Sequence, residues 1–121
     1  MSAQLGRIII YTKQLEAVAD FYVTHFGFDL QRLDGDRIVE LVSHGAGANI
    51  LLHPMPEKRK EGQTLLKLVF DVKDVDDFCR QSKERGLEFG PIHRADGYSF
   101  ANTKDPAKNS ISVSSRAFAG L

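Results

Sequence analysis

The chain has 121 residues, of which 42% are hydrophobic and 26% charged, a composition typical of a soluble globular domain and unlike that of disordered or fibrous chains. Its 16 basic and 16 acidic side chains balance, with no basic block, so we expect no binding to nucleic acid or membrane. Cys79 is the single cysteine, which excludes an intrachain disulfide. No signal peptide or membrane span is recognisable, so a cytoplasmic setting is expected.

The first half of the chain predicts a βαβββ module over residues 5–54. The β-branched run RIIIYT predicts a strand headed by Arg7, and the amphipathic stretch after it predicts a helix that ends at Gly27. Asp34-Gly35 then predicts a tight hairpin, because both residues can take a positive φ at little cost. The apolar run 48–54 predicts the last strand of the module.

The second half repeats this order over residues 64–116, after a polar, proline-flanked linker at 55–63. The strand KLVFD leads into a helix that Asp74 should cap and that should end at Gly86. Asp96-Gly97 predicts the second hairpin, and residues 109–115 predict the last strand. Gln14 stands where Asp74 stands in the repeat and is a poorer helix cap.

One helix covers only one face of a four-stranded sheet, so the other face must be covered by the other module or by a second chain. The expected fold is therefore α+β: two βαβββ modules that form a cup of mixed β-sheet with flanking helices. Whether each cleft forms within one chain or between swapped halves stays open, because the linker permits both.

Three segments carry a resemblance to the vicinal oxygen chelate superfamily, which includes glyoxalase I, extradiol dioxygenases and bleomycin-resistance proteins. LEAVADFYVTHFGF (15–28) resembles its first helix, FDVKDVDDF (70–78) the start of its second module, and TKDPAKNSISV (103–113) its closing segment. The resemblance implies a single glyoxalase-like domain over 1–121. The closing segment departs from the family pattern at Lys108, where glycine is usual.

Metal-dependent members of that superfamily hold an ion with a histidine at the head of the first strand of each module and a glutamate in the last strand. By motif position the four places fall on Arg7, Ile50, Lys67 and Ser112. Arginine, lysine and isoleucine offer no metal-binding lone pair at neutral pH, and a serine hydroxyl is a weak ligand. No metal or other cofactor is therefore expected at these places.

Strand alternation predicts which side chains share the open face of each sheet with the two cations. The predicted ligand-binding residues are Arg7, Ile9, Tyr11, Ile50, Leu52, Lys67, Val69, Asp71 and Ser112. One interpretation is that Arg7 and Lys67 bind a carboxylate, phosphate or enolate oxygen, with Tyr11 and Ser112 orienting the ligand. The other is that both cations are solvated at strand ends or pair with acidic neighbours such as Asp71.

The favoured function is metal-independent binding of a small, anionic or aromatic molecule by a homodimer, and whether any catalysis occurs stays open. Bleomycin-like ligands are cationic, and Arg7 and Lys67 would oppose them. One alternative is a metal-dependent lyase, isomerase or dioxygenase with relocated ligands such as His53, His93 and Glu40, although alternation places His53 on the helix side. The other alternative is a dimeric interaction module with a filled cleft.

Overall fold

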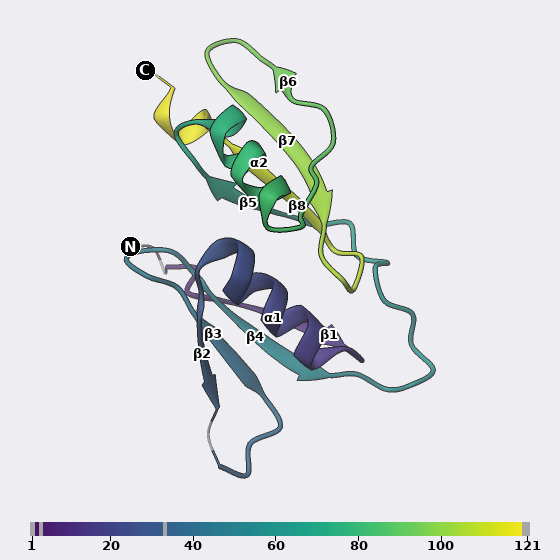
Figure 1. The fold of residues 1–121 in the computed structure, drawn as a ribbon. Helices are drawn as coiled ribbons and strands as arrows, with labels where there is room; N and C mark the ends of the chain where they lie inside the picture. The colour runs from purple at the N-terminus through teal and green to yellow at the C-terminus, as the bar shows by residue number, and fades with distance from the viewer. Residues whose placement is uncertain (1, 3, 33, 120–121) are drawn as a thin grey trace. The chain divides into compact units, whose positions relative to one another are not determined.

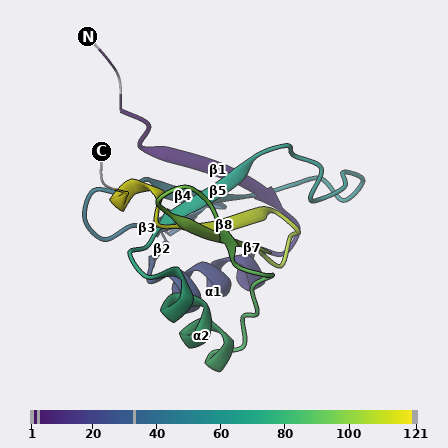
Figure 2. The same cartoon turned by 90° about the horizontal axis from the view of Figure 1, so that it is seen from above.

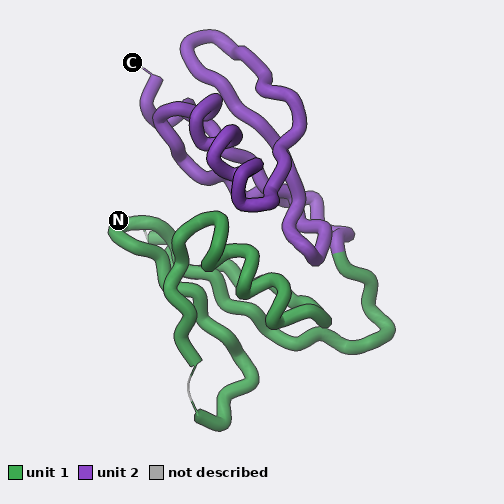
Figure 3. The backbone as a smooth tube through the Cα atoms, viewed as in Figure 1, with its two compact units in different colours: residues 1–61 green, residues 62–121 purple. Residues whose placement is uncertain are grey.

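The computed structural model describes residues 2, 4–32 and 34–119. The chain divides into two compact units, residues 1–61 and residues 62–121 (Figure 3). The division lies inside the segment that was expected to be a linker. Each unit has its own sheet and its own helix, and each is described by itself.

The first unit has the order βαβββ (Figure 1). Its elements are β1 (Arg7–Thr12), α1 (Leu15–Phe26), β2 (Asp29–Arg32), β3 (Val39–Val42) and β4 (Asn49–Pro54). The strands lie in the order β1-β4-β3-β2, with β1 parallel to β4 and the other pairs antiparallel. The helix is thus the crossover that a parallel pair requires.

The second unit repeats this order and topology. Its elements are β5 (Lys67–Asp71), α2 (Val75–Glu84), β6 (His93–Arg94), β7 (Ser99–Lys104), β8 (Ser110–Ser114) and a 3-10 turn at Arg116–Phe118. The strands lie in the order β5-β8-β7-β6, with β5 parallel to β8. The α+β class and the two βαβββ modules predicted from the sequence are confirmed.

The core of the first unit lies between α1 and one face of its sheet. Val18 and Tyr22 of the helix are fully buried, as are Leu41 and Leu52 on the strands. Burying a side chain of this size contributes about 1.5–3 kcal/mol, so this layer holds the helix on the sheet. In the second unit Val75 of α2 and Ile111 and Val113 of β8 are buried. Figure 2 shows each helix on one side of the sheet of its own unit.

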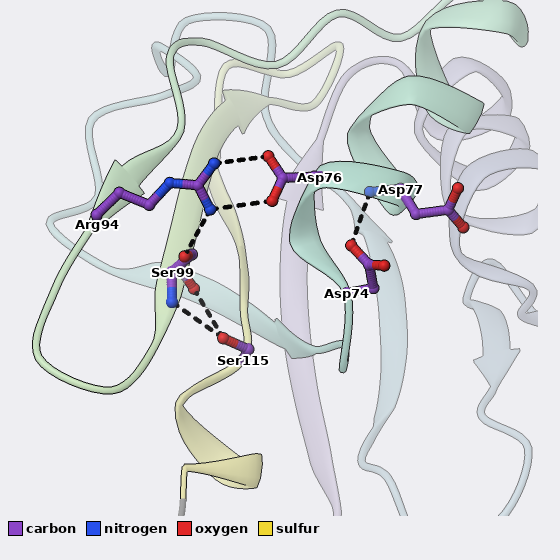
Figure 4. Close-up of polar contacts among 6 residues, drawn as sticks. All are labelled: Asp74, Asp76, Asp77, Arg94, Ser99 and Ser115. Carbon is purple, nitrogen blue, oxygen red and sulfur yellow. Dashed lines mark hydrogen bonds and ion pairs between the residues drawn. The ribbon is translucent and has the colours of Figure 1, made fainter.

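The helix ends follow the sequence prediction. Gly27 ends α1 in the left-handed conformation, with φ of 72°, and Gly86, with φ of 91°, follows the last turn of α2. Asp74 caps α2, since its carboxylate accepts a hydrogen bond from the backbone N–H of Asp77 at 3.0 Å (Figure 4). Gln14 provides no such side-chain bond to α1.

Glu61 provides an acceptor for the three residues just before α1, where Gln14 forms no side-chain cap. Its carboxylate accepts hydrogen bonds from Thr12 Oγ1 and Gln14 Nε2, both at 3.0 Å, and from the backbone N–H of Lys13. Burial acts to raise the pKa of Glu61, but the hydrogen bonds from Lys13, Gln14 and Thr12 outweigh it and lower that pKa below its ordinary value. The end of the linker is therefore attached to the start of the first helix.

Arg94 joins α2 to the edge of its sheet (Figure 4). Its guanidinium donates two hydrogen bonds to the Asp76 carboxylate, at 2.8 and 2.9 Å, and a third to Ser99 Oγ at 3.0 Å. The backbone N–H of Ser99 in turn donates to Ser115 Oγ at 3.0 Å. The bidentate bond to Arg94 lowers the pKa of Asp76, so this pair stays ionised in mild acid.

The two Asp-Gly turns differ from each other. Gly35 and Gly97 have φ of 79° and 82°, whereas Asp96 does not take a positive φ. The Asp96-Gly97 turn is tight, because the Ala95 N–H donates to the Tyr98 carbonyl at 2.9 Å. The prediction of a tight first hairpin is wrong, since β2 ends at residue 32 and β3 begins at 39. There the Asp36 carboxylate accepts the Ile38 N–H at 3.0 Å, a local bond that competes with strand pairing.

The turn before β8 keeps the conformation that a glycine would take. Lys108 has φ of 69°, and it is the one non-glycine residue in the described parts of the chain with a positive φ. The buried Asp105 carboxylate holds the turn by accepting the backbone N–H groups of Ala107 and Asn109, at 3.0 and 2.8 Å. A residue with a Cβ is strained in this conformation, and the Asp105 bonds hold it there.

Among the helices that the structure describes, none combines the length and the apolar character needed to cross a membrane.

Candidate functional site: the open faces of two sheets

Each sheet has one face against its helix and one face without a helix, which we call the open face. Along β1 burial alternates as strand geometry requires, so that Ile10 and Thr12 are buried whereas Ile9 and Tyr11 are 49% and 57% exposed. Paired residues of neighbouring strands lie on the same face, so the register defines each open face completely.

The first open face consists of Arg7, Ile9 and Tyr11 of β1, Asn49, Leu51 and His53 of β4, Glu40 and Val42 of β3, and Asp29 and Gln31 of β2. The second open face consists of Lys67, Val69 and Asp71 of β5, Ser110, Ser112 and Ser114 of β8, Phe100, Asn102 and Lys104 of β7, and His93 of β6.

The placement of Ile50 and Leu52 on the open face is wrong. Ile50 pairs with Ile8 and Leu52 with Ile10, so both lie on the helix side and are buried. The same shift of one residue moves His53 to the open face, where its ring lies 5.1 Å from that of Tyr11. In the run NILLHP the polar Asn49 and His53 share one parity and the apolar Ile50 and Leu52 the other, so alternation itself favours the observed register. The error came from placing Ile50 by its motif position, which is one residue out of register.

The placement of the other residues agrees with the structure. Arg7, Ile9 and Tyr11 share the first open face, and Lys67, Val69, Asp71 and Ser112 share the second. Ser112 is only 3% exposed, and its hydroxyl donates to the Ala101 carbonyl at 3.1 Å. That hydroxyl is therefore already engaged with the backbone, whereas the Tyr11 ring is exposed to a ligand.

The cation of the first module is close to a carboxylate. Arg7 Nε lies 3.8 Å from Glu40 Oε2, and the Asn49 side-chain amide donates to the same oxygen at 3.2 Å. Glu40 thus provides an acidic neighbour on the first open face, as the solvated interpretation of Arg7 anticipated. From the sequence, Glu40 was a candidate only as a ligand of a relocated metal site.

The cation of the second module is held differently. Lys67 Nζ donates a hydrogen bond to Asn102 Oδ1 at 3.1 Å, so its partner is a neutral amide rather than Asp71. Lys67 and Asn102 line a pocket of about 510 Å³ in the second unit. The other residues that line it are Gly90, Thr103, Lys104 and Ser110.

Lys104 and Asn102 were not among the site residues predicted from the sequence. Both lie on β7, whose register with β8 pairs Asn102 with Ser112 and Lys104 with Ser110. The signal available in the sequence was the alternation of side chains along a strand. Because Ser112 was placed on the open face, every second residue of the neighbouring strand had to share that face. Only the exact pairing of the two strands shows that these residues are Phe100, Asn102 and Lys104.

The donor groups at the family's metal positions do not suit a metal ion. The register places Leu51, not Ile50, on the open face of β4, and a leucine also lacks a donor atom. Arg7 and Lys67 have no free lone pair at neutral pH. Across the residues that the structure describes, no group of three or more His, Cys, Asp or Glu side chains could hold a metal ion.

Two rings of the second open face are also packed together. The His93 ring stacks on Phe100 with centroids 4.9 Å apart. Phe100 is in register with Ser114, and Ser114 with Asp71, so the His93–Phe100 pair lies beside these two polar residues. The second open face therefore has an aromatic end and, at Lys67 and Lys104, a cationic end.

The fold and the sequence agree with those of known proteins. A family model described as Glyoxalase/Bleomycin resistance protein/Dioxygenase superfamily matches residues 4–113. Among solved structures, TnmS3, an antibiotic binding protein from Streptomyces sp. CB03234, is 25% identical over 93% of this chain and 94% of its own, with a TM-score of 0.75. A comparison with curated proteins gives no match.

Two further structures show the same fold. A superfamily member from Sphaerobacter thermophilus DSM 20745 is 25% identical, with 93% and 97% of the two chains covered and a TM-score of 0.73. The lactoylglutathione lyase of Agrobacterium tumefaciens is 20% identical, with 99% and 98% covered and a TM-score of 0.74, a likeness of fold alone. The match covers both βαβββ modules, and the chain belongs to the Glyoxalase/Bleomycin resistance protein/Dioxygenase superfamily.

Proposed function

We propose that this protein binds a small organic molecule at the open faces of its sheets, without the metal chemistry of its enzyme relatives. The observation that carries the proposal is the exposure of apolar side chains there: Ile9, Tyr11 and Val69 are 49%, 57% and 55% exposed. Apolar surface with a few polar groups among it is the usual composition of a small-molecule site.

The charged groups at the metal positions support binding over metal catalysis. Arg7 and Lys67 stand where metal-dependent relatives place imidazoles, and two permanent cations there would repel a divalent ion. With His53 on the first open face, a relocated site would still need further ligands beside Glu40. The described residues offer no such cluster within reach.

A relative of this size supports the same function. TnmS3 is described as an antibiotic binding protein and matches this chain over 93% of its length. Binding alone is therefore an activity that this fold supports in a protein of similar extent. As part of the proposal the protein is a homodimer, in which a sheet of a second chain faces an open face and leaves the ligand cleft between the two sheets.

The proposal is tested by titrating ¹⁵N-labelled protein with benzamide, a neutral aromatic probe, and benzoate, its anionic analogue. We expect at least one probe to shift the amide resonances of Tyr11 or Val69 in a saturable way. Tyr11→Ala and Val69→Ser should weaken binding. Leu30→Ser is the matched control, since Leu30 is equally exposed but pairs with the buried Leu41 on the helix side.

Two results would overturn the proposal. The first is that neither probe shifts any open-face resonance up to its solubility limit. The second is that Leu30→Ser weakens binding as much as Tyr11→Ala and Val69→Ser do. Light scattering tests the dimer separately: a particle mass equal to one chain, 13.5 kDa, at micromolar concentration would contradict it.

A further inference from the structure

The two modules differ in how the cation at the head of their first strand is compensated. Arg7 has the Glu40 carboxylate at 3.8 Å, whereas Lys67 has the neutral amide of Asn102 at 3.1 Å. The two contacts are equivalent. In each module the cation of the first strand reaches across the middle strand to β3 or β7. The residue that it contacts there is in register with the residue two positions after the cation, Ile9 or Val69. The charge of Lys67 is therefore not neutralised in the second module.

A second lysine lies in the same row of this sheet. Lys67 of β5 pairs with Ser110 of β8, and Ser110 pairs with Lys104 of β7. Both lysines are exposed and line the same pocket of about 510 Å³. Within the described parts of the chain, neither ammonium group has a carboxylate within 4.0 Å.

The polar side chains of this pocket are suited to an anion. The two ammonium groups donate, the Ser110 hydroxyl between them can donate, and Asn102 Nδ2 is a donor because its Oδ1 accepts from Lys67. The two lysines are separated by β8, about 9–10 Å from strand to strand, and an anion above Ser110 between them relieves the repulsion of their like charges. Asp71 lies on the same strand as Lys67 but four residues away, at the opposite end of the open face.

We propose that the Lys67–Ser110–Lys104 row binds the anionic oxygen group, carboxylate or phosphate, of an organic ligand whose apolar body lies over Val69. This inference rests on the proposed function and names the class of ligand: an organic acid or phosphate ester. Val69 follows Lys67 by two residues on the same face and is 55% exposed, so it provides apolar surface next to the charged end.

The simpler explanation is that the lysines only keep the sheet edge soluble. β5 is an edge strand, and lysines on edge strands prevent pairing with other sheets. That explanation extends to Lys104, because β6 pairs only with Ser99 and Phe100 and does not reach the Lys104 end of β7. It gives no reason, however, for the pocket or for the second donor pair at Ser110 and Asn102.

The test compares benzoate, phenyl phosphate, benzamide and inorganic phosphate on wild type, Lys67→Gln, Lys104→Gln and the double variant. We expect each single change to weaken benzoate and phenyl phosphate binding about three- to tenfold, the double change more, and benzamide binding to stay within about twofold. Lys104→Arg should retain affinity. Lys83→Gln is the matched control, because Lys83 is an exposed lysine on α2.

Affinity for benzoate should also fall as salt rises from about 0.02 to about 0.5 M, because exposed charges are screened. Benzoate and benzamide of equal affinity, or benzoate affinity unchanged in the double variant, would overturn the anion site and leave the proposed function standing. In another outcome, inorganic phosphate shifts the amide resonances of Ser110 and Asn102 while no organic probe binds. That result would support the anion site and contradict the proposed function.

Discussion

Lys67 Nζ donates to Asn102 Oδ1 at 3.1 Å, at the place in the second module where Arg7 of the first module meets Glu40. The repeat thus preserves a contact but not its charge. In one module a cation faces a carboxylate and in the other a cation faces an amide. This difference, rather than the two cations themselves, selects the second open face as the candidate anion site.

Replacing Asn102 by aspartate should remove the anion site by supplying the missing carboxylate. We expect Asn102→Asp to weaken benzoate binding about three- to tenfold, because the new charge pairs with Lys67 and repels the ligand. Binding of benzamide should not change. Isothermal titration calorimetry on both probes measures this.

Glu40→Gln is the matched change in the first module. It removes the acidic partner of an exposed Arg7, so the free energy of unfolding should change by no more than about 0.5 kcal/mol. Benzoate binding at Ser110 and Asn102 should be unaffected. If Asn102→Asp left benzoate affinity at the wild-type level, the unequal charge of the two modules would have no role in binding.

The sequence was sufficient for the fold because its signals were local and repeated. Gly27, Gly86 and Asp74 each act through their own backbone neighbourhood, and the structure shows each of them at a helix end. The two modules could be aligned on such positions without knowledge of any long-range contact. Asp34-Gly35 shows the limit: the same dipeptide gives a longer connection when Asp36 bonds to Ile38 instead.

The site was only partly predictable, because it depends on strand register. Serines alternate with Ile111 and Val113 in β8, so the polar face there was readable from the sequence. In β4 the polar Asn49 and His53 lie on one face and Ile50 and Leu52 on the other, but placing Ile50 by motif position was wrong by one residue, and a slip of one residue exchanges the two faces. Lys104 entered the site only when the pairing of β7 with β8 was known.

Glu61 should contribute to stability as the acceptor at the start of α1. Glu61→Ala removes the hydrogen bonds from Thr12, Lys13 and Gln14, and we expect the free energy of unfolding to fall by about 1–2 kcal/mol. Urea denaturation measures the loss, and hydrogen exchange at the Lys13 amide should accelerate. Glu57→Ala is the control, since only the backbone carbonyl of Glu57 bonds to Lys13. Equal losses for both variants would contradict this role of Glu61.

The contribution of Glu61 should depend on pH in a defined direction. Its pKa in the folded protein is lowered from the ordinary 4.5, so its stabilisation is fully present above that value and is lost as pH falls through the folded pKa. The difference in unfolding free energy between wild type and Glu61→Gln should therefore be constant from about pH 7 to about pH 5.5 and shrink below pH 4.5. A difference that grew in acid would mean that the pKa is raised.

Lys108 should be a site where glycine stabilises the protein. Its φ of 69° is costly for a residue with a Cβ, and the Asp105 carboxylate holds the turn in that conformation. We expect Lys108→Gly to raise the free energy of unfolding by about 0.5–1 kcal/mol, measured by urea denaturation, because relief of this strain exceeds the added freedom of the unfolded chain. Lys108→Ala is the matched control: it removes the same charge but keeps the Cβ, so it should give no gain. An equal gain from both variants would show that the charge of Lys108, and not its backbone conformation, is what destabilises the turn.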